Sequence, residues 1–307
     1  MKKILVTGGA GYIGSHTIVE LIAAGYTPII VDNLCNTSTQ NIDGIKKIID
    51  TEVKWHNVDC TEKEAMDKVF TEHGKIEGVI HFAAYKAVEE SVQNPQKYYD
   101  NNMGSLEVVL KCMQEHDVKN IIFSSSCTVY GMPDILPVDE NAPFKKAESP
   151  YGETKQICEQ MLKEDSCNNV ALRYFNPVGA HSSAKIGELP IGRPQNLVPA
   201  ITQTAIGKLD KLWVHGNDYP TRDGSCIRDY IHVCDLAHAH TLALRYLEQE
   251  RNKESCEIFN LGTGNGNTVL EAITAFEKAS GTKLNYEVGP RRSGDVIAIY
   301  ANKNRAQ

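Results

Sequence analysis

Two residues with complementary acid–base chemistry, Tyr151 and Lys155, stand four positions apart in the chain. On a helix this spacing places the phenol and the ammonium on one face, one turn apart. A cation at that distance favours the phenolate and lowers the tyrosine pKa from its usual value of about 10. We therefore predict that Tyr151 accepts a proton from a substrate hydroxyl near neutral pH. Ser126, earlier in the chain, is expected to relay that proton or to hold the substrate oxygen in place.

A glycine-rich segment near the start predicts a dinucleotide site. Gly8, Gly11 and Gly14 fall between a predicted strand and a predicted helix. Glycines at these positions permit a tight turn and bring the backbone close to a pyrophosphate, which the helix N-terminus then faces. Asp32 ends the next predicted strand, where a carboxylate accepts hydrogen bonds from ribose hydroxyls. Because that carboxylate repels a 2′-phosphate and no arginine adjoins it, we predict NAD rather than NADP.

Strands and helices alternate through the first part of the chain. Apolar runs predict strands, and longer amphipathic patterns predict the helices between them. The strands are expected at 3–7, 28–32, 53–57, 78–82 and 120–124, and the helices at 12–24, 42–50, 63–72 and 95–116. This alternation predicts an α/β fold, a doubly wound parallel Rossmann sheet with helices on both faces.

The alternation becomes less regular after about residue 177, where proline and glycine are frequent. We predict an NAD-binding Rossmann domain at 1–177 and a smaller C-terminal α/β substrate lobe at 178–307, partly interleaved with the first unit. Helices are expected in the second unit at 197–207, 233–247 and 268–280, and strands at 212–215, 256–261 and 284–288.

Composition limits the possible partners. The 307 residues have a formal net charge of −7, and 41% are hydrophobic and 23% charged. An acidic chain lacks the basic surface that nucleic acids and anionic membranes require, and no apolar stretch is long enough to cross a bilayer. None of the nine cysteines forms a C-x-x-C pair. We therefore expect reduced thiols in a cytoplasmic protein and no metal site.

An anionic substrate of this acidic chain would have to be bound by a few local arginines. Arg228 is followed by Asp229, and Arg292 is followed closely by Asp295. The planar guanidinium group matches phosphate oxygens, so these segments could bind a diphosphate. Surface ion pairs account for the same pattern equally well, and only the acidic net charge favours ligand binding.

Eight longer segments support a more specific interpretation. They are TGGAGYIGSH at 7–16, VDNL at 31–34, KAV at 86–88, YDNN at 99–102, SSSCTVYG at 124–131, SPYG at 149–152, RYFNPVGA at 173–180 and RDYIHV at 228–233. In this combination they resemble the UDP-glucose 4-epimerase family, within the extended short-chain dehydrogenases/reductases. The resemblance runs from residue 3 to about residue 302.

The resemblance implies tightly held NAD, a UDP-hexose substrate and a homodimer formed through paired helices. By matched position, the cofactor contacts would come from Gly8, Gly11, Tyr12, Ile13, Gly14, Asp32, Asn33, Asn36, Asp59, Cys60, Phe82, Ala83, Lys86, Asn101, Ser124, Tyr151, Lys155 and Tyr174. The substrate contacts would come from Lys86, Ser126, Tyr151, Phe175, Asn176, Asn196, Leu197, Trp213, His215, Arg228, Tyr230, Arg292, Asp295 and Ile299.

The activity implied is reversible C4 epimerisation of UDP-galactose and UDP-glucose. Tyr151 removes the C4 hydroxyl proton, directly or through Ser126, and the hydride passes to NAD. The transient 4-keto sugar then turns over and receives the hydride on its other face. The alternatives are a nucleotide-sugar 4,6-dehydratase or decarboxylase on the same fold, or a non-catalytic NAD-binding protein. Dehydratases resembling this fold have Asp-Glu where this chain has Cys127, Thr128 and Val129.

Three departures from the family pattern affect the substrate range and the end of the chain. His215 stands where the family commonly has phenylalanine beside the uracil. Ile299 lines the sugar pocket, at a position where family members differ in side-chain size. Its intermediate bulk predicts weak turnover of N-acetylated UDP-sugars beside the plain hexoses. The sequence stops at Gln307, whereas the family continues with about one more helix.

Overall fold

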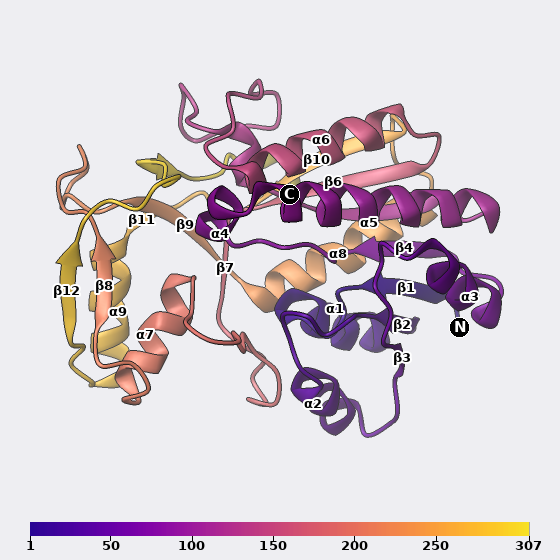
Figure 1. Cartoon of the computed structure of the whole chain (residues 1–307), viewed down its shortest axis with the longest axis horizontal. Coiled ribbons are helices and arrows are strands. Elements are labelled where there is room, and N and C mark those ends of the chain that lie inside the picture. Colours follow the sequence, from indigo (N-terminus) through magenta and orange to yellow (C-terminus); the bar gives the residue numbers. More distant parts are fainter. Residues whose placement is uncertain (307) are drawn as a thin grey trace.

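The computed structural model describes residues 1–306. Its larger part, the body, is a seven-stranded sheet in the order β10-β6-β5-β4-β1-β2-β3 (Figure 1). All of these strands pair in parallel. The strands are β1 Lys3–Thr7, β2 Thr27–Val31, β3 Lys54–His56, β4 Gly78–His81, β5 Asn120–Ser126, β6 Asn168–Tyr174 and β10 Cys256–Leu261. The predicted fold class, a doubly wound parallel sheet, is confirmed.

Helices cover both faces of this sheet because its strands alternate their apolar side chains between the two faces. On β1, Leu5 belongs to the cluster under α3, α5 and α6, while Ile4 and Val6 belong to the cluster under α1, α2 and α8. The helices are α1 Tyr12–Ala23, α2 Gln40–Ile49, α3 Lys63–His73, α4 Val88–Gln93, α5 Pro95–Glu115, α6 Pro150–Glu164 and α8 Val233–Glu248.

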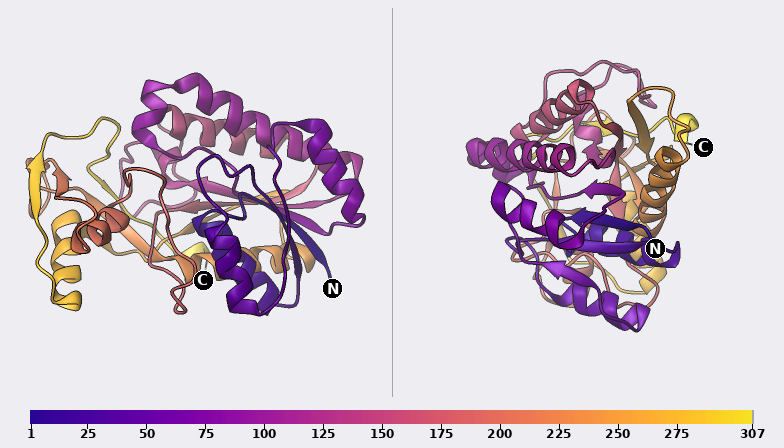
Figure 2. Two further views of the ribbon diagram at one scale, coloured as in Figure 1. Left: turned by 60° about the horizontal axis from the view of Figure 1, so that its bottom comes forward. Right: turned by 90° about the vertical axis from the view of Figure 1, so that its right-hand side faces the viewer.

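The smaller lobe extends from one end of the body (Figure 2). It contains α7 Leu197–Ala205, β8 Leu212–His215, α9 Val269–Ser280 and β12 Tyr286–Gly289, with β8 and β12 paired in parallel. Between lobe and body lies a small sheet of β7 Asn176–Val178, β9 Ile227–His232, β11 Gly266–Thr268 and β13 Ala298–Ile299.

The chain returns from the lobe to the body. Helix α8 packs on the body sheet, and β10 extends that sheet by pairing with β6. Both elements fall within residues 178–307, so the second half of the chain builds parts of both units. Among residues 1–306, no helix combines the length and the hydropathy needed to span a membrane.

Candidate active site

A cavity of about 790 Å³ lies at the carboxyl ends of the central strands. Its walls come from the segments that follow β1 and β4, from the ends of β5 and β6, and from residues on the lobe side that include Arg228 on β9 and Arg292. In open parallel sheets this edge is where ligands bind, at the point where the strand order reverses. Here that point falls between β1 and β4.

The turn between β1 and α1 requires glycine at two positions. Gly8 has a φ of 68°, and a Cβ atom there would lie 2.8 Å from the Ala83 nitrogen. A Cβ atom at Gly14 would lie 2.3 Å from the Gly8 carbonyl oxygen. Gly11, the N-cap of α1, provides no side-chain cap, so the first N–H groups of the helix remain available beside the cavity. Such a turn is suited to a pyrophosphate.

Asp32, which follows β2, lines the same cavity and is fixed by the backbone around it. Its carboxylate accepts hydrogen bonds from the N–H groups of Ala10 at 3.1 Å and Leu34 at 2.9 Å. Burial raises the pKa of Asp32, and these two hydrogen bonds act in the opposite direction. Beside it, the Asn33 amide donates to Asp59 at 2.8 Å. The arrangement places carboxylate and amide groups where a ribose would be held.

Tyr151 is positioned by the start of α6. The Ser149 side chain accepts a hydrogen bond from the Gly152 N–H at 3.2 Å, and Pro150 occupies the first turn. Lys155, one turn later, donates from Nζ to the Ser124 carbonyl at 2.6 Å. All three predicted catalytic side chains, Tyr151, Ser126 and Lys155, line the cavity.

The acid–base balance differs from the sequence-based expectation. Burial raises the pKa of Tyr151 to about 12, and the hydrogen bond with the Ser126 side chain only partly opposes this. Lys155 Nζ lies 6.0 Å from the centre of the Tyr151 ring and bonds to a carbonyl instead of the phenol. Burial also lowers the pKa of Lys155 to about 8. The expected lowering of the tyrosine pKa is therefore wrong in this structure, because desolvation outweighs the neighbouring groups.

Two arginines share one carboxylate at the lobe side of the cavity. Arg292 bonds to Asp295 through Nε at 3.1 Å and Nη2 at 2.9 Å, and Arg228 approaches the same carboxylate at 3.3 Å. Two cations facing one anion leave a local positive charge in an acidic protein. Nearby, Asn176 also lines the cavity, and its Oδ1 atom is buried without a hydrogen-bond partner among the described residues. The two arginines suit an anionic group, and the unpaired amide oxygen suits a hydroxyl or N–H donor of the same ligand.

The structure brings every residue of the predicted cofactor set to the cavity wall. Most of the predicted substrate set lies there too, including Ile299 on β13. Four of its members do not line the cavity: Leu197, Trp213, His215 and Tyr230. Trp213 and His215 alternate along β8 with Leu212 and Val214, which are buried in the lobe cluster, so they project from the opposite face of that strand. The hydroxyl of Tyr230 is buried with no partner among residues 1–306.

One wall of the cavity was not predicted. Residues 188–191, 193 and 195 line it, and Glu188 in this segment accepts from Lys86 at 3.1 Å and from the predicted substrate residue Asn196 at 2.5 Å. Arg193 adds a further cation to this wall. The only signal in the sequence is a charged residue within a segment rich in glycine and proline.

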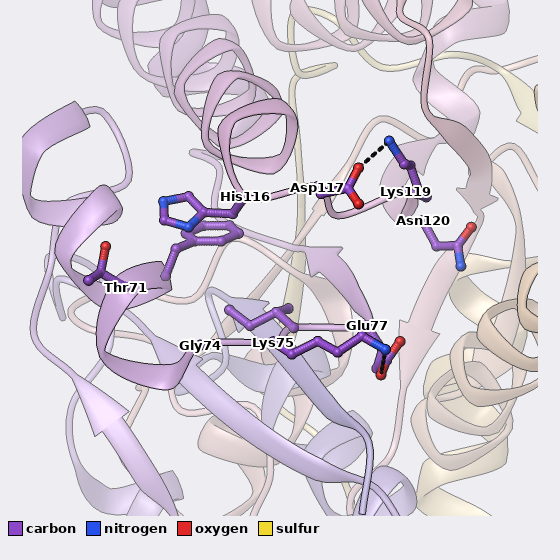
Figure 3. Close-up of a pocket in the computed structure, with 10 residues that line it drawn as sticks. Thr71, Gly74, Lys75, Glu77, His116, Asp117, Lys119 and Asn120 are labelled. Carbon is purple, nitrogen blue, oxygen red and sulfur yellow. Dashed lines mark ion pairs between the residues drawn. The ribbon is translucent and has the colours of Figure 1, made fainter.

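A second cavity, of about 620 Å³, lies at the opposite end of the sheet, where β4 and β5 begin (Figure 3). The charged side chains around it are paired with one another. Lys75 contacts Glu77 at 2.8 Å, and Lys119 contacts Asp117 at 2.5 Å. This cavity lacks the predicted Gly8–Gly14 segment and the predicted acid–base groups, so the cavity at the carboxyl ends is the candidate active site.

Comparisons with known proteins agree with this geometry. Residues 4–262 match the model of the NAD dependent epimerase/dehydratase family, and the chain belongs to that family. It is 50% identical to the UDP-glucose 4-epimerase of Schizosaccharomyces pombe, over 99% of this chain and 87% of that protein. It is 48% identical to the UDP-glucose 4-epimerase of Bacillus subtilis, over 99% of this chain and 90% of that protein.

A solved structure gives the same result. The crystal structure of UDP-glucose 4-epimerase from Bifidobacterium longum, in complex with NAD+ and UDP, superposes with a TM-score of 0.95 at 46% identity. The match covers 99% of this chain and 91% of that one. The resemblance read from the sequence motifs is thereby confirmed.

Proposed function

We propose that this chain catalyses the reversible C4 epimerisation of UDP-galactose and UDP-glucose, using tightly bound NAD. The observation that decides it is the meeting of three features in one cavity. Tyr151, Ser126 and Lys155 lie between the glycine turn on one side and the Arg228–Arg292 pair on the other. Relatives about 50% identical have the same activity in their names.

The residues present fit NAD. A Cβ atom at Gly8 or Gly14 would collide with neighbouring backbone, so glycine allows the tight turn that brings the start of α1 to the place of a pyrophosphate. Asp32, Asn33 and Asp59 would hold the adenine ribose end, and Tyr151 and Lys155 the nicotinamide ribose end. NAD, when bound, supplies the hydride acceptor and donor for C4 of the sugar. The carboxylate of Asp32 excludes the 2′-phosphate of NADP.

Tyr151 and Ser126 move the proton. Ser126 hydrogen-bonds to the Tyr151 side chain, so a proton taken from the C4 hydroxyl can pass through Ser126 to the phenolic oxygen. A pKa of about 12 means that the phenolate needs a positive charge to form near neutral pH. Lys155 is the cation on the same helix face, and although burial lowers its pKa to about 8, its ammonium is still largely protonated at neutral pH. The same two side chains return the proton after the sugar has turned over.

Arg228, Arg292 and Asn176 would anchor the nucleotide part of the substrate. Guanidinium groups bind diphosphate oxygens, and the free Oδ1 of Asn176 offers an acceptor. A firm anchor allows the hexose to rotate while the substrate stays bound, so that the binding energy comes from the part that does not react. His215, Trp213, Leu197 and Tyr230 are proposed to contact the uridine, although they lie outside the cavity wall.

The alternative activities have less support. A dehydratase needs an acid–base pair after Ser126, but the side chains there are Cys127, Thr128 and Val129. Val129 is fully buried, and burial raises the pKa of the Cys127 thiol to about 12. Neither can donate or accept a proton near neutral pH. A non-catalytic NAD-binding protein would have no need for the complete set of Tyr151, Ser126 and Lys155.

The proposal extends to assembly and location. Partly exposed apolar side chains on α5 and α6, among them Met103, Val108 and Met161, lie next to the core cluster and support a homodimer through these helices. Sedimentation analysis would give the oligomeric state. All nine cysteines are free thiols, which supports a reducing compartment and therefore the cytoplasm.

Incubation of the purified protein with UDP-galactose tests the activity. We expect UDP-glucose as the only new sugar nucleotide in the proton NMR spectrum, and NAD(H), not NADP(H), after acid release from the protein. A 4-keto-6-deoxy product would indicate a dehydratase. Bound NAD without any conversion would indicate a non-catalytic protein, and either result contradicts the proposal.

A further inference from the structure

Two histidines and a glutamate meet at the outer edge of the body, away from the candidate active site. His56 ends β3, the edge strand of the sheet, and Glu72 and His73 end α3. The Nε2 atoms of the two histidines lie 2.7 Å apart, with the rings nearly perpendicular. One ligand atom from each of the three residues lies within 4.8 Å of the others. Thr71 and Gly74, the residues before Glu72 and after His73 in the chain, are labelled in Figure 3.

We propose that His56, Glu72 and His73 form a binding site for a divalent transition-metal ion such as Zn²⁺. Two imidazoles and one carboxylate are ligands that Zn²⁺ accepts in a tetrahedral site, with water as the fourth. This site was not predicted from the sequence, because His56 and His73 come from different elements and have no spacing typical of zinc motifs.

The geometry requires only a small movement. Two Zn–N bonds of about 2.05 Å at a tetrahedral angle hold their nitrogens about 3.3 Å apart. The present separation of 2.7 Å is that of a direct hydrogen bond between the rings. Opening it by about 0.6 Å would let one ion replace the shared proton. Both imidazoles are only partly buried and Glu72 is exposed, so their side chains are free to rotate.

The charges nearby predict which ion is preferred. Lys3 donates from Nζ to the carbonyl of His73 at 2.5 Å, and Lys54 begins β3 close by. Glu72 is the only anion in the cluster, so a cation gains little from long-range attraction here. Binding must come from the imidazole nitrogens, which favours Zn²⁺, Ni²⁺ or Cu²⁺ over Ca²⁺ and Mg²⁺.

A bound ion would connect the end of α3 to the edge strand. The carbonyl of His56 accepts a hydrogen bond from the Asp32 N–H at 3.1 Å, so the edge strand directly supports the backbone of the proposed ribose-binding carboxylate. The ion would stabilise this part of the body and has no role in the proposed hydride and proton transfers.

Titration of the full-length, tag-free protein with ZnCl₂ in a non-chelating buffer tests the site. We expect binding at this site to raise the melting temperature. His56→Gln/His73→Gln should weaken the Zn²⁺ affinity at least ~10-fold, and Glu72→Gln, an exposed change that leaves the core intact, should weaken it less. His238→Gln is the matched control, because His238 is exposed and pairs with a single carboxylate, Glu20.

Substitution with Co²⁺ identifies the ligands. A visible absorption band typical of tetrahedral coordination by nitrogen and oxygen is expected in the native protein and should be lost in the double variant. Equal Zn²⁺ affinity in the native protein and both ligand variants would overturn the proposal. A thiolate charge-transfer band, from the exposed Cys35 or from the partly buried Cys234 and Cys256, would overturn it as well.

Discussion

The body and the lobe hold their side chains in different ways. In the body, whole strands such as β4 are buried on both faces, and Tyr151 and Lys155 are fixed by a capped helix. The lobe has a cluster of only five buried apolar residues, and its strand β12 leaves Tyr286 and Val288 about two-fifths exposed. On the proposed function, the chemistry would rest on rigid elements, whereas the nucleotide would be held partly by a less densely packed unit that can adjust to it.

The largest effect is expected where the body performs chemistry. Tyr151→Phe removes the proposed proton acceptor and should lower kcat by roughly 10²-fold or more, because general acid–base groups contribute that much. The affinity for UDP, measured by calorimetry, should stay unchanged, because the anchor lies on the lobe side. Tyr286→Phe, a lobe change at an exposed ring, is the control. Near-normal turnover in Tyr151→Phe would contradict the assigned role.

The next largest difference between the body and the lobe is expected in how much one ion pair contributes to stability in each unit. Arg173 and Glu159 are almost fully buried in the body, with Nη2 and Oε2 2.6 Å apart. Arg173→Met leaves a buried charge without its partner and should cost about 3–5 kcal/mol in urea unfolding. The exposed lobe pair of Arg222 and Glu271 should contribute nothing measurable when Arg222 is changed to methionine.

The double variant Arg173→Met/Glu159→Met sharpens this test. Because it removes both charges, most of the lost stability should return. Equal unfolding midpoints for Arg173→Met and Arg222→Met would show that the body does not depend on its buried pair more than the lobe depends on its exposed one.

Low pH should reduce the stability of the body, because its buried histidines resist protonation. Burial lowers the pKa of His81 to about 3 and those of His16 and His240 to about 4, from 6.5. Below pH 6.5 the unfolded chain takes up protons that the folded chain refuses, so stability falls as the pH drops from 6.5 toward 4. Each histidine contributes at most about 1.4 kcal/mol per pH unit.

Urea unfolding at several pH values from 7.5 to about 4.5 checks this slope. His240 donates from Nδ1 to the Leu236 carbonyl and accepts from the Tyr174 hydroxyl at Nε2, so His240→Gln should make the slope shallower. His238→Gln, two residues earlier on the same helix but exposed, should leave it unchanged. The same slope in both variants would contradict this assignment.

The smallest effect concerns substrate range at the boundary between the units. Ile299 is 2% exposed, packs in a cluster with Cys127 and Phe175, and lines the cavity. A change of this size in a pocket alters discrimination by about 1–3 kcal/mol. We expect weak turnover of the N-acetylated UDP-sugars by the native protein, and Ile299→Tyr should suppress it while largely sparing UDP-galactose. An unchanged ratio of the two activities would show that Ile299 does not control the range.

Local sequence patterns were sufficient to predict those parts of the site that are determined by residues close together in the chain. The glycine turn, the Asp32 position and the Tyr151–Lys155 spacing are fixed within a few residues. Strands β1 to β5 follow from short apolar runs, whereas β6 was not among the predicted strands. The burial that raises the pKa of Tyr151 depends on packing between distant segments, so the local Tyr151–Lys155 spacing predicted a shift in the opposite direction. The wall formed by residues 188–195 has no periodic pattern, and its contacts with Lys86, Asn196 and Arg292 place it over the cavity.

The return of the chain from the lobe has a consequence for the order of folding. Cys256 on β10 pairs with Asn169 on β6, and much of the lobe lies between them in the sequence. The sheet is therefore completed only after this long loop has closed, which costs chain entropy before the last strand is gained. During synthesis, β6 would remain an open sheet edge until β10 emerges. An unprotected edge invites pairing with other chains, so chaperone dependence should be greatest in that interval.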